Sequence, residues 1–183
     1  MQELSMNILD VAENSVSAGA SLVRITLGQD TAAALQTLTI EDNGRGMSAE
    51  MAAAVTDPFV TSRTTRKVGL GLPFLKMAAE MTGGQMHITS ALGAGTTVAA
   101  TFGLGHIDLA PLGDIGGTVA TLCQGAPDTD FVFTFTRDGR EFAFDTRQAR
   151  EILGGVPLDT PEVTLFIRDH VREGVQQVLD GHN

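Results

Sequence analysis

Three glycine-bearing segments occur in a fixed order in the first half of this 183-residue chain. They are DVAENSVSAGA at 10–20, EDNGRGM at 41–47, and VGLGL at 68–72, which is followed by GAGTT at 93–97. Each segment lies between a stretch patterned like a strand and a stretch patterned like a helix. Glycine lets the backbone approach a ligand closely, and helix N-termini attract anions. The series therefore predicts an α/β fold with a nucleotide pocket.

Hydrophobic periodicity divides the whole chain into helices and strands. We expect helices at 4–18, 48–55, 72–81, 113–124, 146–153 and 160–179. We expect strands at 22–27, 37–41, 86–90, 97–102, 131–136 and 141–144, and loops at 28–36, 56–69 and 105–112. Residues 137–140 are typical of a hairpin turn. Ser48 and Thr160 are expected to cap the helices that follow them.

Charge and composition exclude several classes of function. The net charge of −10 makes the chain a poor partner for nucleic acid or an anionic membrane. The first residues, MQELSMN, do not have the pattern of a signal peptide, and no apolar run is long enough to span a bilayer. A cytoplasmic location is therefore the simplest expectation. Cys123, the single cysteine, excludes a disulfide framework and is expected in the core.

The first segment places two polar side chains four residues apart on a predicted helix. Asp10 and Asn14 therefore project from the same helical face. The amide oxygen of Asn14 is a suitable ligand for Mg²⁺, which prefers hard oxygen donors and takes few of them from protein. The carboxylate of Asp10 could position a water molecule. The same spacing is also typical of a solvated polar stripe on a surface helix.

The second segment indicates a pocket for a base. The Asp42 carboxylate stands at a strand end, where it could accept a hydrogen bond from an adenine amino group. Gly44 and Gly46 would let the backbone approach the ring, and Met47 would pack against it. The alternative is a tight turn, because Asn43-Gly44 is a common turn dipeptide.

The third segment indicates a site for phosphates. Gly69 and Gly71 directly precede a predicted helix, whose first N–H groups favour an anion. The chain's densest basic cluster, Arg63, Arg66 and Lys67, stands just before them and could contact a distal phosphate. A structural glycine loop and a solvated basic loop are the alternatives.

Taken together, the motifs resemble those of the GHKL ATPases, which include gyrase, the ninety-kilodalton heat-shock chaperones, histidine kinases and mismatch-repair ATPases. The resemblance covers residues 4–103. ENSVSAGA is most similar to the mismatch-repair proteins, and the stretch from VGLGLPFLKM to GAGTTVAATF is most similar to the histidine kinases. Asp57-Pro58-Phe59 resembles the phenylalanine box of the kinases. The resemblance implies the Bergerat fold, a two-layer α/β sandwich of a mixed sheet covered by helices.

The resemblance also implies ATP and Mg²⁺ as ligands, with a role for each motif. Asn14 would ligate the metal, and Asp42, supported by Thr96, would bind adenine. Gly69, Leu70 and Gly71 would hold phosphates beneath a lid at 56–68, and Leu72 would also belong to the nucleotide-binding site. Arg63, Arg66 and Lys67 would lie in that lid.

The chain departs from the family pattern at Asp10. Family members that hydrolyse ATP usually have glutamate at this position, and aspartate is one methylene shorter. If Asp10 is a catalytic base, its carboxylate must still reach the attacking water. Glu13 is not expected to replace it, because adjacent helical residues point about 100° apart. The sequence is compatible with ATP hydrolysis, with transfer of the terminal phosphoryl group, and with ATP binding alone.

The chain also departs from the family outside the motifs. Histidine kinases carry a helical pair with the phosphoacceptor histidine before this domain, and we expect no such pair here. We therefore expect a stand-alone ATP-binding domain at 1–104 and a helix/β-hairpin/helix extension at 105–183. Our hypothesis is a regulatory protein that phosphorylates a protein partner, as the related anti-sigma serine kinases do. The alternatives are an ATP-dependent conformational switch and a slow ATPase. The sequence does not indicate an oligomeric state.

Overall fold

A computed structural model describes residues 2–57 and 69–181 of the chain. One six-stranded sheet runs through it in the order β3-β4-β2-β1-β5-β6. The strands are β1 (Leu22–Asp30), β2 (Leu35–Asp42), β3 (Met86–Ala91), β4 (Gly95–Gly103), β5 (Asp130–Arg137) and β6 (Arg140–Asp145). The helices are α1 (Leu4–Ser17), α2 (Ala49–Ala54), α4 (Gly71–Met81), α5 (Ile115–Gly125), α6 (Thr146–Leu153) and α7 (Pro161–Asp180).

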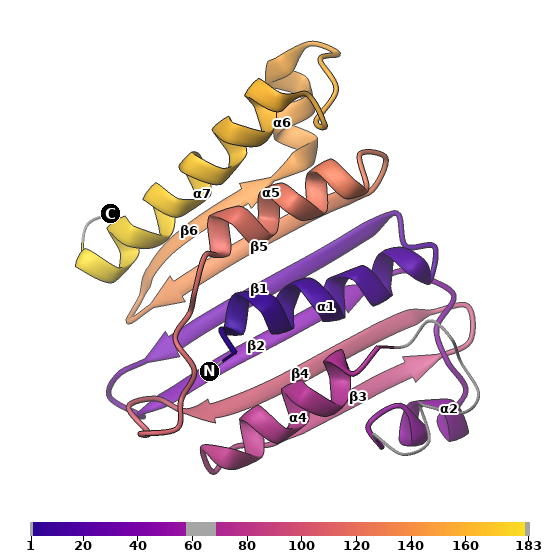
Figure 1. The fold of residues 1–183 in the computed structure, drawn as a ribbon, viewed down its shortest axis with the longest axis vertical. Coiled ribbons are helices and arrows are strands. Elements are labelled where there is room, and N and C mark those ends of the chain that lie inside the picture. The colour runs from indigo at the N-terminus through magenta and orange to yellow at the C-terminus, as the bar shows by residue number, and fades with distance from the viewer. Residues whose placement is uncertain (1, 58–68, 182–183) are drawn as a thin grey trace.

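The helices and the sheet form two layers. Figure 1 shows α4, α1, α5 and α7 side by side on one face of the sheet, with α7 beyond the edge strand β6. β1 pairs in parallel with β5, whereas every other pair of neighbouring strands is antiparallel. The predicted fold class, a mixed sheet covered by helices, is confirmed.

The core lies between these two layers. On α1 the buried side chains include Leu4, Ile8 and Val11, which share one helical stripe. The strands contribute alternate residues to the same core, among them Phe133 and Phe135 of β5, while their other side chains face away from the helices. An antiparallel sheet with one solvated face commonly shows this alternation.

The first hairpin is longer than the sequence predicts. β1 and β2 extend to Asp30 and from Leu35, so residues 28–36 are not the loop that we expected. The reason is a polar pair inside the hairpin: the Gln29 Nε2 donates to the Gln36 Oε1 at 2.8 Å, and both side chains are buried. The Gln29 Oε1 also accepts from the Arg137 Nη1 of β5 at 2.7 Å, so hydrogen bonds to both neighbouring strands hold Gln29 in place. The strands therefore continue here without the apolar pattern that predicts a strand.

The predicted caps differ in their outcome. Ser48 caps α2 as expected, since its hydroxyl accepts from the Met51 N–H. Thr160 occupies the N-cap position of α7, but its hydroxyl donates to the Pro157 carbonyl at 2.7 Å instead. The predicted turn at 137–140 is confirmed, with positive φ at both Asp138 and Gly139, as a two-residue hairpin requires. Cys123 is a core residue, and burial raises the pKa of its thiol to about 12.

Candidate functional site

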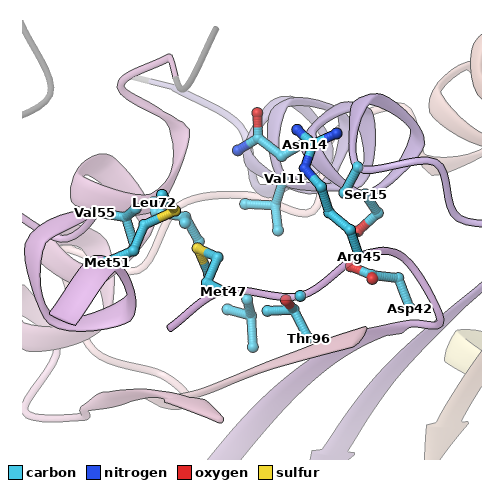
Figure 2. A pocket seen from close by; sticks show the side chains of 13 residues that line it. Val11, Asn14, Ser15, Asp42, Arg45, Met47, Met51, Val55, Leu72 and Thr96 are labelled. Carbon is cyan, nitrogen blue, oxygen red and sulfur yellow. Dashed lines mark hydrogen bonds between the residues drawn. The ribbon is translucent and has the colours of Figure 1, made fainter. Parts of the chain in front are cut away.

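A hollow opens beside Asp42, between α1 and the ends of β2 and β4 (Figure 2). Its empty volume, including the part open to solvent, is about 630 Å³. One side is polar and the remainder is mainly apolar, as is usual in small-molecule sites. The lining residues are Val11, Asn14, Ser15, Ala18, Asp42, Arg45, Gly46, Met47, Met51, Val55, Leu72, Thr96 and Val98. We call it the Asp42 hollow.

Two donors fix the carboxylate of Asp42. The Ser15 hydroxyl donates to Oδ2 at 2.7 Å, and the Gly44 N–H donates to Oδ1 at 2.9 Å. A carboxylate has about four acceptor positions, so both oxygens can accept further hydrogen bonds. Ser15 is buried on α1, 27 residues away in sequence. The carboxylate is thus held in one orientation at the wall of the hollow.

Thr96 stands opposite Asp42 in the β2–β4 register. Its hydroxyl lies 2.8 Å from the Ser90 hydroxyl, which also accepts from the Met47 N–H at 2.8 Å. Ser90 therefore links the beginning of β4 to the segment that carries Met47. The structure places Thr96, Met47 and Asp42 around the same hollow, as the sequence predicts for a base pocket.

The two glycines of this segment pack so closely against neighbouring backbone that neither position has room for a side chain. Gly46 has a φ of +69°, and a Cβ there would lie 1.9 Å from the Ala91 carbonyl oxygen. A Cβ on Gly44 would lie 2.8 Å from the Ala18 carbonyl oxygen. Gly46 lines the hollow, whereas Gly44 supports it through its hydrogen bond to Asp42. Protein packing alone thus requires glycine at both positions.

A second hollow lies on the other side of Asn14. Its empty volume is about 660 Å³, and it lies between α1 and the beginning of α4. The lining residues are Asp10, Glu13, Asn14, Ser17, Gly69, Leu70, Gly71 and Phe74. We call it the Asp10 hollow. Asn14 lines both hollows, so a single elongated ligand could occupy them together.

Asp10 and Gly71 hold α1 and α4 close together at this second hollow. A Cβ on Gly71 would lie 2.9 Å from the Cβ of Asp10, so only glycine permits the observed approach. Leu70 is the N-cap residue of α4, and the first N–H groups of a helix have no partner within it. These N–H groups favour an anion. Burial raises the pKa of the Asp10 carboxyl, which makes its carboxylate a stronger base.

Comparison with known proteins agrees with this geometry. The sequence model of the family described as histidine kinase-, DNA gyrase B-, and HSP90-like ATPase matches residues 1–106. The chain belongs to this ATPase family. Sporulation kinase D of Bacillus subtilis is 35% identical over 94 residues, which are 51% of this chain and 18% of that protein. A putative sensor protein of Shewanella frigidimarina is 30% identical over 109 residues, which are 59% of this chain and 16% of that protein.

A solved structure supports the fold. The crystal structure of the N-terminal domain of a DNA repair protein aligns with a TM-score of 0.51 and 14% sequence identity, over 78% of this chain and 52% of that chain. The predicted membership of the GHKL ATPases is confirmed, and this membership supports ATP binding. Across the described ranges, no helix is long and apolar enough to cross a membrane.

The donors near Asn14 are compatible with the Mg²⁺ that commonly accompanies ATP in this ATPase family. Outside residues 58–68 and the chain ends, no group of three or more His, Cys, Asp or Glu side chains could hold a metal ion on its own. Asn14 and Asp10 offer hard oxygen atoms in one hollow. Mg²⁺ typically takes one or two protein ligands and completes its shell with phosphates and water. The residues therefore suit a metal that arrives with the nucleotide.

Not every predicted residue of the ATPase site can be placed. Arg63, Arg66 and Lys67 lie outside the described residues, as do Pro58 and Phe59 of the phenylalanine box. Glu13, which we expected to point away, also reaches the rim of the Asp10 hollow. Three residues that sequence reasoning missed belong to the site: Ser15, Arg45 and Ser90. Ser15 left a detectable signal, since it is a polar residue within the apolar stripe of α1.

Proposed function

We propose that the two hollows bind a single Mg²⁺-ATP, with the base in the Asp42 hollow and the phosphates in the Asp10 hollow. Asn14 carries this proposal, because it lines both hollows and is the residue expected to ligate the metal. The fixed Asp42 carboxylate would accept a hydrogen bond from the adenine amino group. The N–H groups at the start of α4 would face the phosphates.

We further propose that the bound ATP serves regulation, with its terminal phosphoryl group passing to a protein partner. The named kinase among the relatives supports this reading. An apolar row on α4 also supports a protein partner: Leu70, Phe74, Met77 and Met81 are all more than one-third exposed. Their spacing places them along one side of the helix. Leu70 and Phe74 also line the Asp10 hollow, so a ligand there would touch the same row.

A second candidate function is slow ATP hydrolysis with Asp10 as the general base. The close approach of Gly71 to Asp10 favours this function. It brings the start of α4 near the aspartate, whose side chain is one methylene shorter than the usual glutamate. An ATP-dependent conformational switch needs binding but neither chemical step. Incubation with labelled ATP and Mg²⁺ separates these functions. Label on a partner supports a kinase, released phosphate supports an ATPase, and binding without either supports a switch.

The substitution Asp42→Asn tests the base assignment. Asparagine has the same size as aspartate, but it replaces one of the two acceptor oxygens by an amide N–H₂ group. The side chain then has one acceptor oxygen left to serve Ser15, Gly44 and the adenine amino group. We expect ATP affinity to fall about tenfold, the value of one charge-assisted hydrogen bond, with little change for GTP. Glu41→Gln is the matched control, since Glu41 is an exposed neighbour on the same strand. Equal losses for ATP and GTP would contradict the proposed adenine contact.

A further inference from the structure

Arg45 is fixed at both its backbone and its side chain. Its N–H donates to the Ala18 carbonyl at 2.9 Å, and its own carbonyl accepts from the Gly93 N–H at 2.7 Å. The guanidinium Nη1 donates to the Ser17 carbonyl at 3.2 Å, at the end of α1. Two segments distant in sequence, the end of α1 and the β3–β4 turn, therefore determine where this exposed arginine stands.

The guanidinium stands where the two hollows meet. Arg45 lines the Asp42 hollow, whereas Ser17, which it contacts, lines the Asp10 hollow. Figure 2 shows the side chain of Arg45 extending from the segment beside Asp42 toward α1. The guanidinium has five N–H donors and uses one of them on Ser17. It therefore retains donors for a ligand that crosses from one hollow to the other.

The charge around this junction gives Arg45 a particular role. Asp10, Glu13 and Asp42 line the hollows, and Arg45 is the only Lys or Arg among the described lining residues. A nucleotide in this orientation has its base at Asp42 and its metal-bound phosphates near Asn14. Its first phosphate must then pass the junction. A guanidinium binds phosphate oxygens through charge-assisted hydrogen bonds.

We infer that Arg45 binds the α-phosphate of the nucleotide, the phosphate attached to the ribose. This inference rests on the proposed function, because it assumes the same orientation of the ligand. It makes Arg45 a phosphate-binding residue that neither the motif pattern nor the family match assigns. Every adenine nucleotide carries an α-phosphate, so AMP, ADP and ATP should all depend on Arg45. Adenosine has no phosphate and should not.

Calorimetric or NMR titration of the full chain with adenosine, AMP, ADP and ATP tests the inference. For Arg45→Gln we expect about a tenfold loss of affinity for each of the three nucleotides, since one charge-assisted hydrogen bond is lost, and unchanged adenosine affinity. Arg24→Gln is the matched control: it removes the same charge from an exposed position of β1 that lines neither hollow. The control should bind all four ligands like the wild type.

Each other outcome overturns the inference in a distinguishable way. Unchanged nucleotide affinity in Arg45→Gln would mean that the guanidinium does not bind phosphate. An equal loss for adenosine would mean that Arg45 maintains the Asp42 hollow instead. A loss confined to ATP would move the contact to the distal phosphates. If the wild-type chain bound none of the four ligands, the proposed function itself would fail, and this inference with it.

Discussion

At the scale of single residues, the proposed role of Asp10 as general base can be tested by substitution. The substitution Asp10→Asn keeps the shape of the side chain and removes its basicity. If Asp10 is the general base, we expect turnover to fall about a hundredfold or more, with ATP affinity nearly unchanged. Steady-state phosphate release and ATP titration measure the two quantities. Glu13→Gln is the control, because Glu13 lies one turn further along α1 and lines the same hollow. Equal turnover in Asp10→Asn and the wild type would exclude Asp10 as the base.

The raised pKa of Asp10 also predicts a difference in stability between the variant and the wild type. Burial raises this pKa above 3.8, so the folded chain favours the protonated carboxyl more than the unfolded chain does. Above the raised pKa the ionised carboxylate therefore lowers the free energy of unfolding. Below the unfolded pKa both states are protonated and this effect disappears. In urea at pH 7, Asp10→Asn should have a higher free energy of unfolding than the wild type. This difference should vanish at a pH below the pKa of the unfolded chain.

At the scale of elements, the approach of α4 to α1 depends on Gly71. A methyl group there would stand 2.9 Å from the Asp10 Cβ, so the two helices would have to separate. We expect Gly71→Ala to lower the free energy of unfolding by about 1 kcal/mol through overpacking, although alanine is the better helix former. Gly69→Ala is the matched control, because a Cβ there would meet no atom of the described residues within 4 Å. Urea denaturation compares the two variants. A Gly71→Ala variant as stable as Gly69→Ala would contradict the packing argument.

The sequence predicts elements better than the contacts between them. The amphipathic pattern of α1 locates it within one residue, because burial of a single stripe produces a local period. The end of β1 and the start of β2 are not predicted, because the buried residues there are Gln29 and Gln36, which form a hydrogen bond between the strands. Asp42 was predicted from its turn, but its partner Ser15 lies 27 residues away. No periodicity encodes such a tertiary pair, and the same holds for Arg45 and Ser17.

At the scale of the whole molecule, the sheet does not end where the family match ends. The match stops at residue 106, yet β5 pairs with β1 from Leu22 to Gln29, which is all of β1 except its last residue. The extension also reaches α1, since the Leu4 N–H donates to the Pro111 carbonyl and the Thr118 hydroxyl donates to the Ser5 carbonyl. The extension therefore covers β1 and α1 on one side of the first half of the chain. We propose that residues 105–183 are needed to keep the first half folded.

A fragment of residues 1–106 tests this dependence. Without β5, the fragment would expose the edge of β1, and without α5 it would expose the flank of α1. Unpaired strand edges promote aggregation. We expect the full chain to unfold in one cooperative transition and the fragment to be much less stable or to aggregate, as scattering and thermal unfolding would show.

Co-expression of residues 107–183 as a separate chain should restore solubility, because it supplies β5 and α5 again. A monomeric fragment that melts at the temperature of the full chain would show instead that the first half is an autonomous domain. ATP binding would then need none of the extension.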